Sequence, residues 1–276
     1  MSGPDQWSLP AVATRPVFGY GVSAEAVADR VAVITGASHG IGSGLAARFS
    51  ELGLRVGMCA RKRPEPPPAA DRQRVVTMSA DVRDAADLEA LTASVTERFG
   101  RVDLWVNNAG VIDPIGKLAD VDPGKVANQF AVNVVGVANG SRAFARHVRR
   151  RPGGGVLVNI TSGAATTVYV GWAAYCASKA AVEHLTAVVA EEERGEGLRA
   201  YSLAPGIVDT DMQAKVRAAS IESFPAVEKF LEAKRNGAFN TSSWVADGVL
   251  ELAFGTVDIE PGGVVRVPDE WEHRSP

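Results

Sequence analysis

The chain has 276 residues, of which 46% are hydrophobic, and its formal net charge is -3. Its length and apolar content fit one large α/β domain, and it lacks the basic stripe with interleaved aromatic residues that nucleic-acid binding requires. We therefore expect small-molecule partners, with neither nucleic acid nor membrane among them. Two cysteines, Cys59 and Cys176, cannot build a disulfide framework or a metal cluster, which favours a reducing compartment.

The N-terminal segment is rich in proline, glycine and alanine without a clear period, and we interpret residues 1–28 as an extension before the domain. It contains prolines and an aspartate where a secretion signal needs an unbroken apolar run. No stretch of membrane-spanning length is free of polar residues either. These observations predict a soluble, cytoplasmic protein.

Beyond this segment, short apolar stretches rich in β-branched residues alternate with helical patterns. Strands are predicted at 30–37, 54–60, 74–82, 101–110, 154–163, 198–206 and 262–268. Helices are predicted at 40–53, 84–99, 123–150 and 173–194. Because strands that alternate with helices are typical of a parallel sheet covered on both faces, residues 29–270 are predicted to form a single α/β domain, a doubly wound Rossmann-type sheet of about seven strands.

The segment TGASHGIG (35–42) follows a predicted strand and opens a predicted helix, which is the context that a dinucleotide-binding loop requires. Gly36 permits a tight turn, while Gly40 and Gly42 let the backbone come close to a pyrophosphate and to a strand. The first amides of the helix can then bind the phosphates. Glycines are also routine in structural loops, but the strand and the helix together favour dinucleotide binding.

The segment YCASK places Tyr175 and Lys179 four residues apart, and therefore on one face of a helix, one turn from each other. A free phenol, with a pKa of about 10, exchanges protons poorly at neutral pH. Since a nearby ammonium favours the phenolate, we expect Lys179 to lower the pKa of Tyr175 towards the working range. The alternative is a helix face on which the tyrosine fills the core and the lysine is solvated.

Several segments, in order along residues 28–268, together resemble the short-chain dehydrogenase/reductase family. They are TGASHGIG, NNAG (107–110), AVNVVG with Asn133, NITSG (159–163), YCASK and PGIVDTDM (205–212). A YxxxK pair alone would be weak evidence, whereas the ordered set is specific. The resemblance implies a fold, a nicotinamide cofactor and a set of site residues.

The catalytic residues that the resemblance implies are Asn133, Ser162, Tyr175 and Lys179. Tyr175 would be the general acid that protonates a carbonyl oxygen, and Lys179 would also hold the nicotinamide ribose. Ser162 stands 13 residues before the tyrosine, the interval usual in the family, and would donate to the substrate carbonyl. Asn133 would kink its helix and hold a water that relays protons to the lysine. The alternatives are a turn residue for Ser162 and an asparagine satisfied by neighbouring backbone for Asn133.

The family pattern also implies cofactor contacts. Asp81 and Val82 resemble the pair at the adenine ring, although an aspartate after a strand is often only a helix cap. Thr210 resembles the residue that holds the nicotinamide carboxamide, and Asn107 is expected to stabilise the sheet. The predicted NADP(H)-binding set is Gly36, Ser38, His39, Gly40, Ile41, Gly42, Arg61, Asp81, Val82, Asn108, Ala109, Gly110, Tyr175, Lys179, Pro205, Gly206, Val208 and Thr210.

The end of the second predicted strand bears on the choice between NADP(H) and NAD(H). NAD-selective members carry an acidic residue there that binds the ribose 2′-OH, whereas this chain has Ala60. Arg61 follows and can hold a 2′-phosphate bidentately, so NADPH is the predicted cofactor. His39 stands where many NADP-preferring relatives carry Lys or Arg, and as a neutral imidazole it contributes less. The alternative is that 61–63 is a solvated charge run, ahead of prolines at 64–68 that prevent a regular helix.

These features predict an NADP(H)-dependent oxidoreductase that transfers a hydride between the nicotinamide and a ketone, an aldehyde or a secondary alcohol, with carbonyl reduction favoured. The alternative is a catalytically silent NADP(H)-binding regulatory protein, and such proteins often lack the tyrosine or the lysine. PGIVDTDMQ (205–213), segment 233–253 and the ending GGVVRVPDEW look more loosely similar to the sepiapterin and benzil reductases, which reduce dicarbonyl or side-chain keto compounds. Residues 209–240 are expected to form a lid over the substrate, and Phe224, Phe230 and Trp244 are expected either to line it or to pack it.

A homodimer or homotetramer is expected because the predicted helices at 123–150 and 173–194 carry surplus apolar residues, and the family commonly pairs these helices. The residues are Val126, Phe130, Val182 and Leu185.

No metal site is expected, since the histidines are scattered without ligand spacing and most should lie at the surface. The histidines are His39, His147, His184 and His273.

Overall fold

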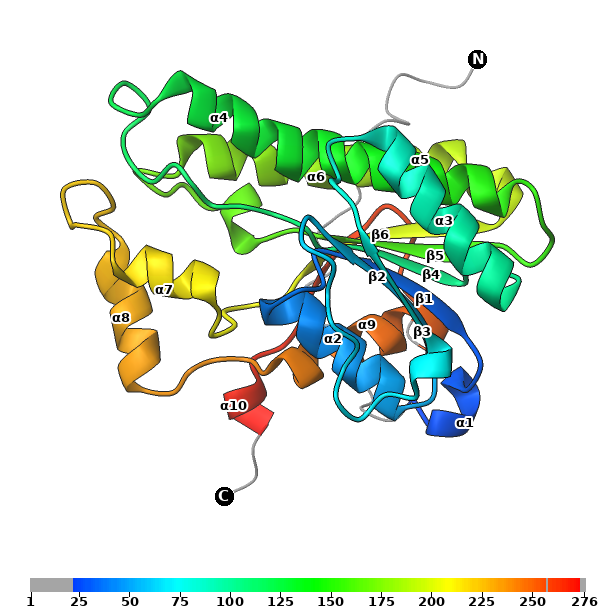
Figure 1. Cartoon of the computed structure of the whole chain (residues 1–276). Helices are drawn as coiled ribbons and strands as arrows, with labels where there is room; N and C mark the ends of the chain where they lie inside the picture. Colours follow the sequence, from blue (N-terminus) through cyan, green and yellow to red (C-terminus); the bar gives the residue numbers. More distant parts are fainter. Residues whose placement is uncertain (1–21, 257, 274–276) are drawn as a thin grey trace, which may run out of the picture.

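The computed structural model describes residues 22–256 and 258–273 (Figure 1). Residues 1–21, which make up most of the predicted extension, lie outside the described residues. The described chain begins with a short helix, α1 (Ala24–Val27), and Val27 is fully buried in the core. The packed part of the chain therefore includes α1, just before the predicted domain boundary at residue 29.

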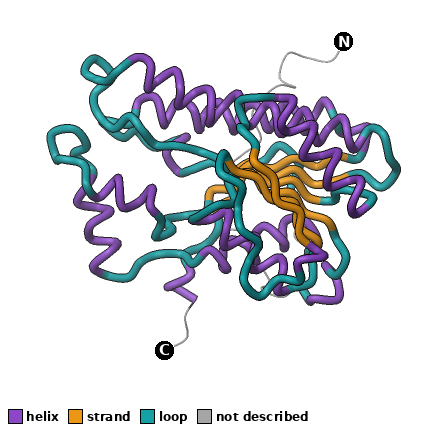
Figure 2. The backbone as a smooth tube through the Cα atoms, viewed as in Figure 1, coloured by secondary structure: helices purple, strands orange, loops and turns teal. Residues whose placement is uncertain are grey.

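A parallel sheet of seven strands forms the centre of the domain (Figure 2). The strands are β1 (Val31–Thr35), β2 (Arg55–Ala60), β3 (Val75–Ser79), β4 (Leu104–Asn107), β5 (Gly155–Ile160), β6 (Leu198–Ala204) and β7 (Val264–Arg266). Each lies within a predicted range, and their spatial order is β3-β2-β1-β4-β5-β6-β7. The order reverses between β1 and β4, and such a reversal opens a crevice outside the carboxyl ends of the strands.

Helices cover both faces of the sheet (Figure 1). On one face α2 (Gly40–Glu51) packs against α9 (Ser242–Phe254), and on the other face lie α3 (Ala85–Phe99), α5 (Gly136–Val148) and α6 (Ala173–Glu192). Strand β1 contributes to both cores because successive side chains alternate: Ile34 packs on the α2 side and Val33 on the α3 side. The doubly wound fold predicted from the alternating pattern is confirmed.

The predicted helix at 123–150 is interrupted. It begins as α4 (Pro123–Phe130), where the Asp122 side chain accepts the N–H of Lys125 and caps the first turn. A π-helical turn (Ala131–Val135) then joins α4 to α5. Such bulges often mark functional positions in helices, and this one contains Asn133.

The lid region contains helices that the sequence pattern did not predict. Helices α7 (Asp211–Arg217) and α8 (Val227–Arg235) project beyond the sheet, and α10 (Glu270–His273) lies near the C-terminal end (Figure 1). Short 3₁₀ turns, η1 (Arg72–Arg74), η3 (Gly163–Ala165) and η4 (Arg194–Glu196), complete the elements. Of the helices in the described part of the chain, none is long and apolar enough to cross a membrane.

A buried polar network at the end of β4 joins the sheet to the helices. Asn107 accepts the indole N–H of Trp105 at 2.8 Å and donates to the side-chain oxygen of Asn159 at 2.9 Å. Asn159 in turn donates to the Thr186 hydroxyl on α6 at 2.9 Å. The expected structural role of Asn107 follows from these contacts, because its side-chain oxygen and nitrogen both find buried partners on the sheet.

One residue expected at a subunit interface lies inside the domain. Val182 of α6 is fully buried, because this face of α6 packs onto the sheet and α4. It is therefore unavailable for pairing with another chain. Leu185, one turn further along α6, remains partly exposed.

Candidate active site

A single cleft of about 1740 Å³ runs along the carboxyl ends of the strands and under the lid. It extends from Arg61 and Asp81, after β2 and β3, to Trp172 and Phe230 beside the lid. Every residue of the predicted cofactor set except Gly42 lines it, together with Ser162. Topology thus gathers side chains that are far apart in the sequence into one site.

The glycine loop is shaped by close contacts that only glycine permits. Gly36 has a φ of +67°, and a Cβ there would lie 2.7 Å from the Cα of Ala109. Gly40 has a φ of +58°, and a Cβ there would lie 3.3 Å from a methyl carbon of Thr210. The two glycines therefore bring the loop backbone against the loops that follow β4 and β6.

Gly42 packs against the loop after β4. It does not line the cleft, and a Cβ on Gly42 would lie 2.5 Å from the side-chain nitrogen of Asn108. That nitrogen donates to the carbonyl oxygens of Thr35 and Gly36, so Gly42 leaves room for the clamp that holds the loop. Of the two functions that the sequence assigns to Gly40 and Gly42, close approach to a pyrophosphate and to a strand, this contact supports the second for Gly42.

Tyr175 and Lys179 lie one turn apart on α6, as predicted, and both are buried in the wall of the cleft. The Lys179 ammonium donates to the carbonyl oxygen of Ile160 at 2.9 Å and lies 5.8 Å from the centroid of the Tyr175 ring. Ser162 lines the cleft beside them, at the turn after β5. The three side chains implied by the family pattern are therefore brought together.

Burial controls the ionisation of this pair. It raises the pKa of Tyr175 to about 12, with a hydrogen bond from Ser162 acting in the opposite direction. It lowers the pKa of Lys179 to about 8, opposed by the charge of Glu183. The net shift of the Tyr175 pKa is therefore upward, away from the working range expected from the sequence, because a dry environment disfavours the phenolate and the Lys179 ammonium donates to a backbone carbonyl. At neutral pH the tyrosine is a protonated acid.

Asn133 is fully buried in the π-helical turn and does not line the cleft. Its side chain accepts the N–H of Val111 at 2.8 Å and donates to the carbonyl of Val111 at 2.9 Å. It also donates to the hydroxyl of Ser178 on α6 at 3.1 Å. Asn133 thus ties the loop after β4 to α6, and neighbouring groups satisfy most of its hydrogen bonds, as the structural alternative proposed.

Ser162 combines the two roles considered for it. Its hydroxyl oxygen accepts the N–H of Ala164 at 3.2 Å and caps the η3 turn, while the residue lines the cleft near Tyr175. The cap leaves the hydroxyl proton available for donation into the cleft, since a hydroxyl can accept and donate together.

Aromatic side chains line the end of the cleft that lies beside α8. Trp172 stacks on Phe224 with centroids 4.3 Å apart, and it also contacts Tyr175 at 5.4 Å and Tyr169 at 5.0 Å. Tyr169, Trp172 and Phe230 line the cleft, whereas Phe224 is fully buried beneath Trp172. Sequence reasoning missed Tyr169 and Trp172, although the spacing of three residues between Tyr169, Trp172 and Tyr175 was available as a signal.

The residues expected in or near the lid also differ in whether they line the cleft. Trp244 does not line the cleft, and its indole N–H donates to the carbonyl of Pro268 at 2.8 Å. Lys229 lines the cleft and donates to the Tyr169 hydroxyl at 2.9 Å, and Lys215 forms an ion pair with Asp113 across the cleft mouth. These contacts join α7 and α8 to the loops after β4 and β5.

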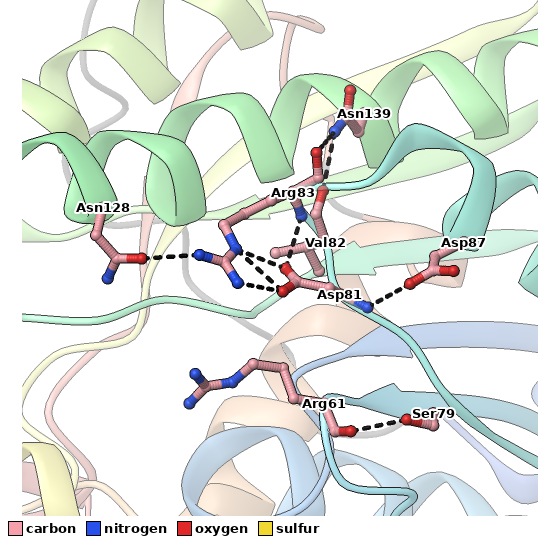
Figure 3. A network of polar contacts seen from close by, with 8 residues as sticks. All are labelled: Arg61, Ser79, Asp81, Val82, Arg83, Asp87, Asn128 and Asn139. Carbon is pink, nitrogen blue, oxygen red and sulfur yellow. Dashed lines mark hydrogen bonds and ion pairs between the residues drawn. The ribbon is translucent and has the colours of Figure 1, made fainter.

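At the opposite end of the cleft, Arg61 and Lys62 line the wall, whereas Arg63 does not. The Ser79 hydroxyl donates to the backbone carbonyl of Arg61 at 2.7 Å and fixes the chain where it leaves β2 (Figure 3). Arg63 turns to β3, where it donates to the Thr77 hydroxyl at 2.8 Å. Arg61 and Lys62 therefore face the cleft, whereas Arg63 is held by β3.

His147 departs from the expectation that the histidines lie mostly at the surface. It is half-buried, accepts the N–H of Val102 at Nε2 at 3.0 Å and stacks on Phe144. Burial, the largest cause, lowers its pKa to about 4, and it therefore acts as a neutral structural group. Within the described residues, no three His, Cys, Asp or Glu side chains are grouped as a metal site would need.

A family model described as short chain dehydrogenase matches residues 30–221. The chain is a short-chain dehydrogenase. It is 30% identical over 223 residues to benzil reductase ((S)-benzoin forming) of Bacillus subtilis (strain 168), a match that covers 80% of this chain and 91% of that protein. It is also 33% identical over 196 residues to an NADPH-dependent pterin aldehyde reductase of Arabidopsis thaliana, covering 70% and 80% of the two chains. Among solved structures, the KRED1-Pglu enzyme superposes with a TM-score of 0.75 and 28% identity over 86% of this chain and 100% of that one.

The buried ammonium of Lys179 predicts a stability cost in this short-chain dehydrogenase. Its folded-state pKa of about 8 lies below the ordinary 10.5, so the unfolded state binds more protons between these values and stability rises with pH there. Below pH 8 both states are charged and the full cost is present. We predict that Lys179→Met without cofactor is more stable than the wild type at about pH 7, and that the difference shrinks between about pH 8 and pH 10.5.

Thermal unfolding across this pH range measures the effect. The matched control is Lys234→Met, which removes an exposed lysine paired with Asp209 on the lid and should not be stabilising. A Lys179→Met protein that is less stable than the wild type at every pH would contradict the assignment of a desolvated ammonium.

Proposed function

We propose that this short-chain dehydrogenase is an NADP(H)-dependent carbonyl reductase that acts on ketones or aldehydes with an aromatic or bulky apolar group. The observation that carries the proposal is the protonated, buried hydroxyl of Tyr175, beside Ser162, in the same cleft as the glycine loop. A proton donor of this kind is what carbonyl reduction needs, and the dinucleotide is the hydride source when bound.

The residues present fit a dinucleotide. Gly36 and Gly40 line the cleft, where their positive φ angles and close contacts with Ala109 and Thr210 exclude side chains, and the start of α2 directs backbone amides there. The cleft volume, about 1740 Å³, exceeds the roughly 1,000 Å³ upper range of ordinary small-ligand pockets, which leaves space for a cofactor and a substrate together. Thr210, Pro205 and Gly206 would hold its nicotinamide end.

The roles of the side chains follow from their protonation. The hydroxyls of Ser162 and Tyr175 would both donate to the substrate carbonyl and orient it, and the Tyr175 proton would pass to the oxygen as negative charge develops there. The Lys179 ammonium would stabilise the phenolate that remains. With its pKa of about 8, it can also return a proton near neutral pH. Asn133 would hold the loop after β4 in place against α6.

The substrate class is supported by the aromatic wall. Tyr169, Trp172 and Phe230 present rings to the cleft next to Tyr175, and such rings favour aromatic or bulky apolar groups. The similarity to a benzil reductase and a pterin aldehyde reductase, whose names specify carbonyl substrates carrying rings, supports the same class.

We also propose a homodimer or homotetramer. Val135 in the π-helical turn and Val188 on α6 are 48% and 44% exposed, and Leu185 and Val189 lie in a surface recess between α5 and α6. Apolar residues grouped on adjacent helices favour isologous pairing with a second copy.

Replacing Tyr175 with phenylalanine removes only the hydroxyl. We predict that Tyr175→Phe folds and binds NADPH but turns over at least about a thousandfold more slowly, since the proton donor is lost. Single-turnover oxidation of NADPH with a panel of aryl ketones and aldehydes measures this. The matched control is Tyr201→Phe, because Tyr201 is also buried but its hydroxyl donates to Ile259 away from the cleft.

Two outcomes would count against this proposal. Near wild-type turnover by Tyr175→Phe would remove the catalytic assignment. A wild-type protein that binds NADPH tightly but oxidises it with no carbonyl of the panel would favour the alternative of a silent regulatory protein.

The cofactor preference is tested at Arg61. We predict a higher kcat/KM with NADPH than with NADH, and a fall in that ratio of about tenfold or more in Arg61→Ala, since a charge-assisted bidentate contact to the 2′-phosphate is lost. Arg63→Ala is the matched control, because Arg63 belongs to the same basic run but bonds to Thr77. If NADH serves equally well in the wild type, or if Arg61→Ala leaves the ratio unchanged, the preference for NADPH is wrong.

A further inference from the structure

Asp81 lines the cofactor end of the cleft, and its carboxylate forms a bidentate ion pair with Arg83 (Figure 3). The Arg83 Nε donates to Oδ1 and Oδ2 of Asp81 at 2.9 and 3.0 Å, and Nη2 donates to Oδ2 as well. The backbone N–H of Arg83 also donates to Oδ1 at 3.0 Å. Asp81 lines the cleft and Arg83 does not, so the arginine holds the carboxylate from outside the site.

The segment that carries this pair is fixed on several sides. Asp87 accepts the backbone N–H of Asp81 at 2.8 Å, and Asn139 of α5 donates to the carbonyl of Val82 at 2.9 Å. The remaining arm of Arg83 donates to the side chain of Asn128 on α4 at 3.0 Å (Figure 3). The bonds of Asp87 and Asn139 fix the backbone beside the carboxylate, and the Arg83 guanidinium then sets its orientation before any ligand arrives.

The donors of Arg83 do not exhaust the acceptor capacity of Asp81. A carboxylate has about four lone-pair sites. The Nε, Nη2 and backbone N–H groups of Arg83 supply three protons in four contacts, because the Nε proton is shared between Oδ1 and Oδ2. When that shared proton engages one oxygen only, about one acceptor position is free for a further donor. The 6-amino group of adenine is a donor of suitable size for that position. A ribose 2′-phosphate held by Arg61 would be joined to the same nucleoside, which places the adenine ring close to Asp81.

The charges around Asp81 also favour a 2′-phosphate at this end of the cleft. Hydrogen bonding by Arg83 is the largest cause that holds the pKa of Asp81 below its usual range, and the charge of Arg61 adds to it. A lone carboxylate beside a 2′-phosphate would repel it, as the acidic residues of NAD-selective proteins do. The charge of Arg83 compensates that of Asp81 and removes the repulsion. Among the residues drawn in Figure 3, the guanidinium of Arg61 makes no contact, so it can face the phosphate.

We propose that Arg83 is a positioning residue for cofactor recognition: it turns Asp81 into an oriented, charge-compensated acceptor for the adenine amino group next to the 2′-phosphate. The proposal rests on the NADP(H) dependence proposed above. It makes separate predictions for orientation and for charge, which different variants of Arg83 can distinguish.

Equilibrium binding of three dinucleotides to the full chain, without substrate, provides the test. They are NADPH, NADH, and the NADPH analogue in which hypoxanthine replaces adenine and the 6-amino group is absent. For the wild type we expect the hypoxanthine analogue to bind about tenfold more weakly than NADPH, since a hydrogen bond to a charged acceptor is lost. Fluorescence titration or calorimetry measures the dissociation constants.

Arg83→Met removes the planar guanidinium and its charge but keeps much of the length of the side chain. We expect discrimination against the hypoxanthine analogue to fall below about threefold, and the preference for NADPH over NADH to fall by about fivefold, because the carboxylate is neither held nor compensated. Arg83→Lys restores the charge without the planar fork. It should keep the NADPH preference within about twofold of the wild type while discrimination against the analogue stays low.

Two controls separate this role from a general loosening of the fold. Asn128→Ala removes the contact to α4 but leaves the pair with Asp81, and Arg194→Met removes an exposed arginine paired with Glu191 far from the cleft. Both should keep the two ratios of the wild type. A loss of discrimination in Asn128→Ala as large as in Arg83→Met would assign the effect to α4 and overturn the proposal.

The remaining outcomes are also decisive. A wild type that binds NADPH and the hypoxanthine analogue equally, or Arg83 variants with unchanged ratios, would overturn the role of Arg83 while leaving the reductase proposal intact. A wild type that binds none of the dinucleotides would instead remove the proposed function itself, and the inference that rests on it.

Discussion

The removal of Tyr175 and Lys179 from water is the constraint on which the site depends. Both side chains are nearly inaccessible on one face of α6, and burial moves their pKa values in opposite directions, to about 12 and about 8. The tyrosine is thereby kept as an acid, and the lysine as a cation that gives up its proton more readily than in water. On an exposed helix the two pKa values would stay near 10 and 10.5, and the lysine would not titrate near neutral pH.

Other parts of the structure maintain this burial. The Ile160 carbonyl gives the ammonium a partner, and Asn133 joins the loop after β4 to α6. Trp172 packs between Phe224 and Tyr175 on one side of the pair. Lys229 of α8 bonds to Tyr169 beside Trp172, and Lys215 of α7 pairs with Asp113 in the loop after β4, so both helices are attached to the loops that border the cleft.

Much of the fold could be predicted because the signals are local. Each strand is a short β-branched run, and the glycine loop and the YCASK helix carry their residues at fixed spacing. Helix α9 escaped prediction because it is buried on most sides and has little amphipathic period, and α7 and α8 depend on partners far away in the sequence, such as Asp113 and Tyr169. Local patterns do not report such contacts.

The errors at the site have the same origin. The sequence shows that Tyr175 and Lys179 share a helix face, but their pKa values follow from burial and from the Ile160 carbonyl, which only the packed structure supplies. Gly40 and Gly42 belong to one motif, yet only Gly40 faces the cleft. Asp81 was predicted from the family resemblance, whereas its partner Arg83 carries no motif and was found only from geometry.

The pH dependence of kcat/KM for carbonyl reduction by the wild type tests the central claim most directly, because it reports the ionisation of the free protein. If Tyr175 is a protonated acid supported by a charged Lys179, the value should be constant from about pH 6 to pH 7.5 and fall as pH rises through the Lys179 pKa of about 8. A value that instead rises with pH through this range would mean that reduction requires the deprotonated form of the pair. That result would contradict the account of a site built on desolvation.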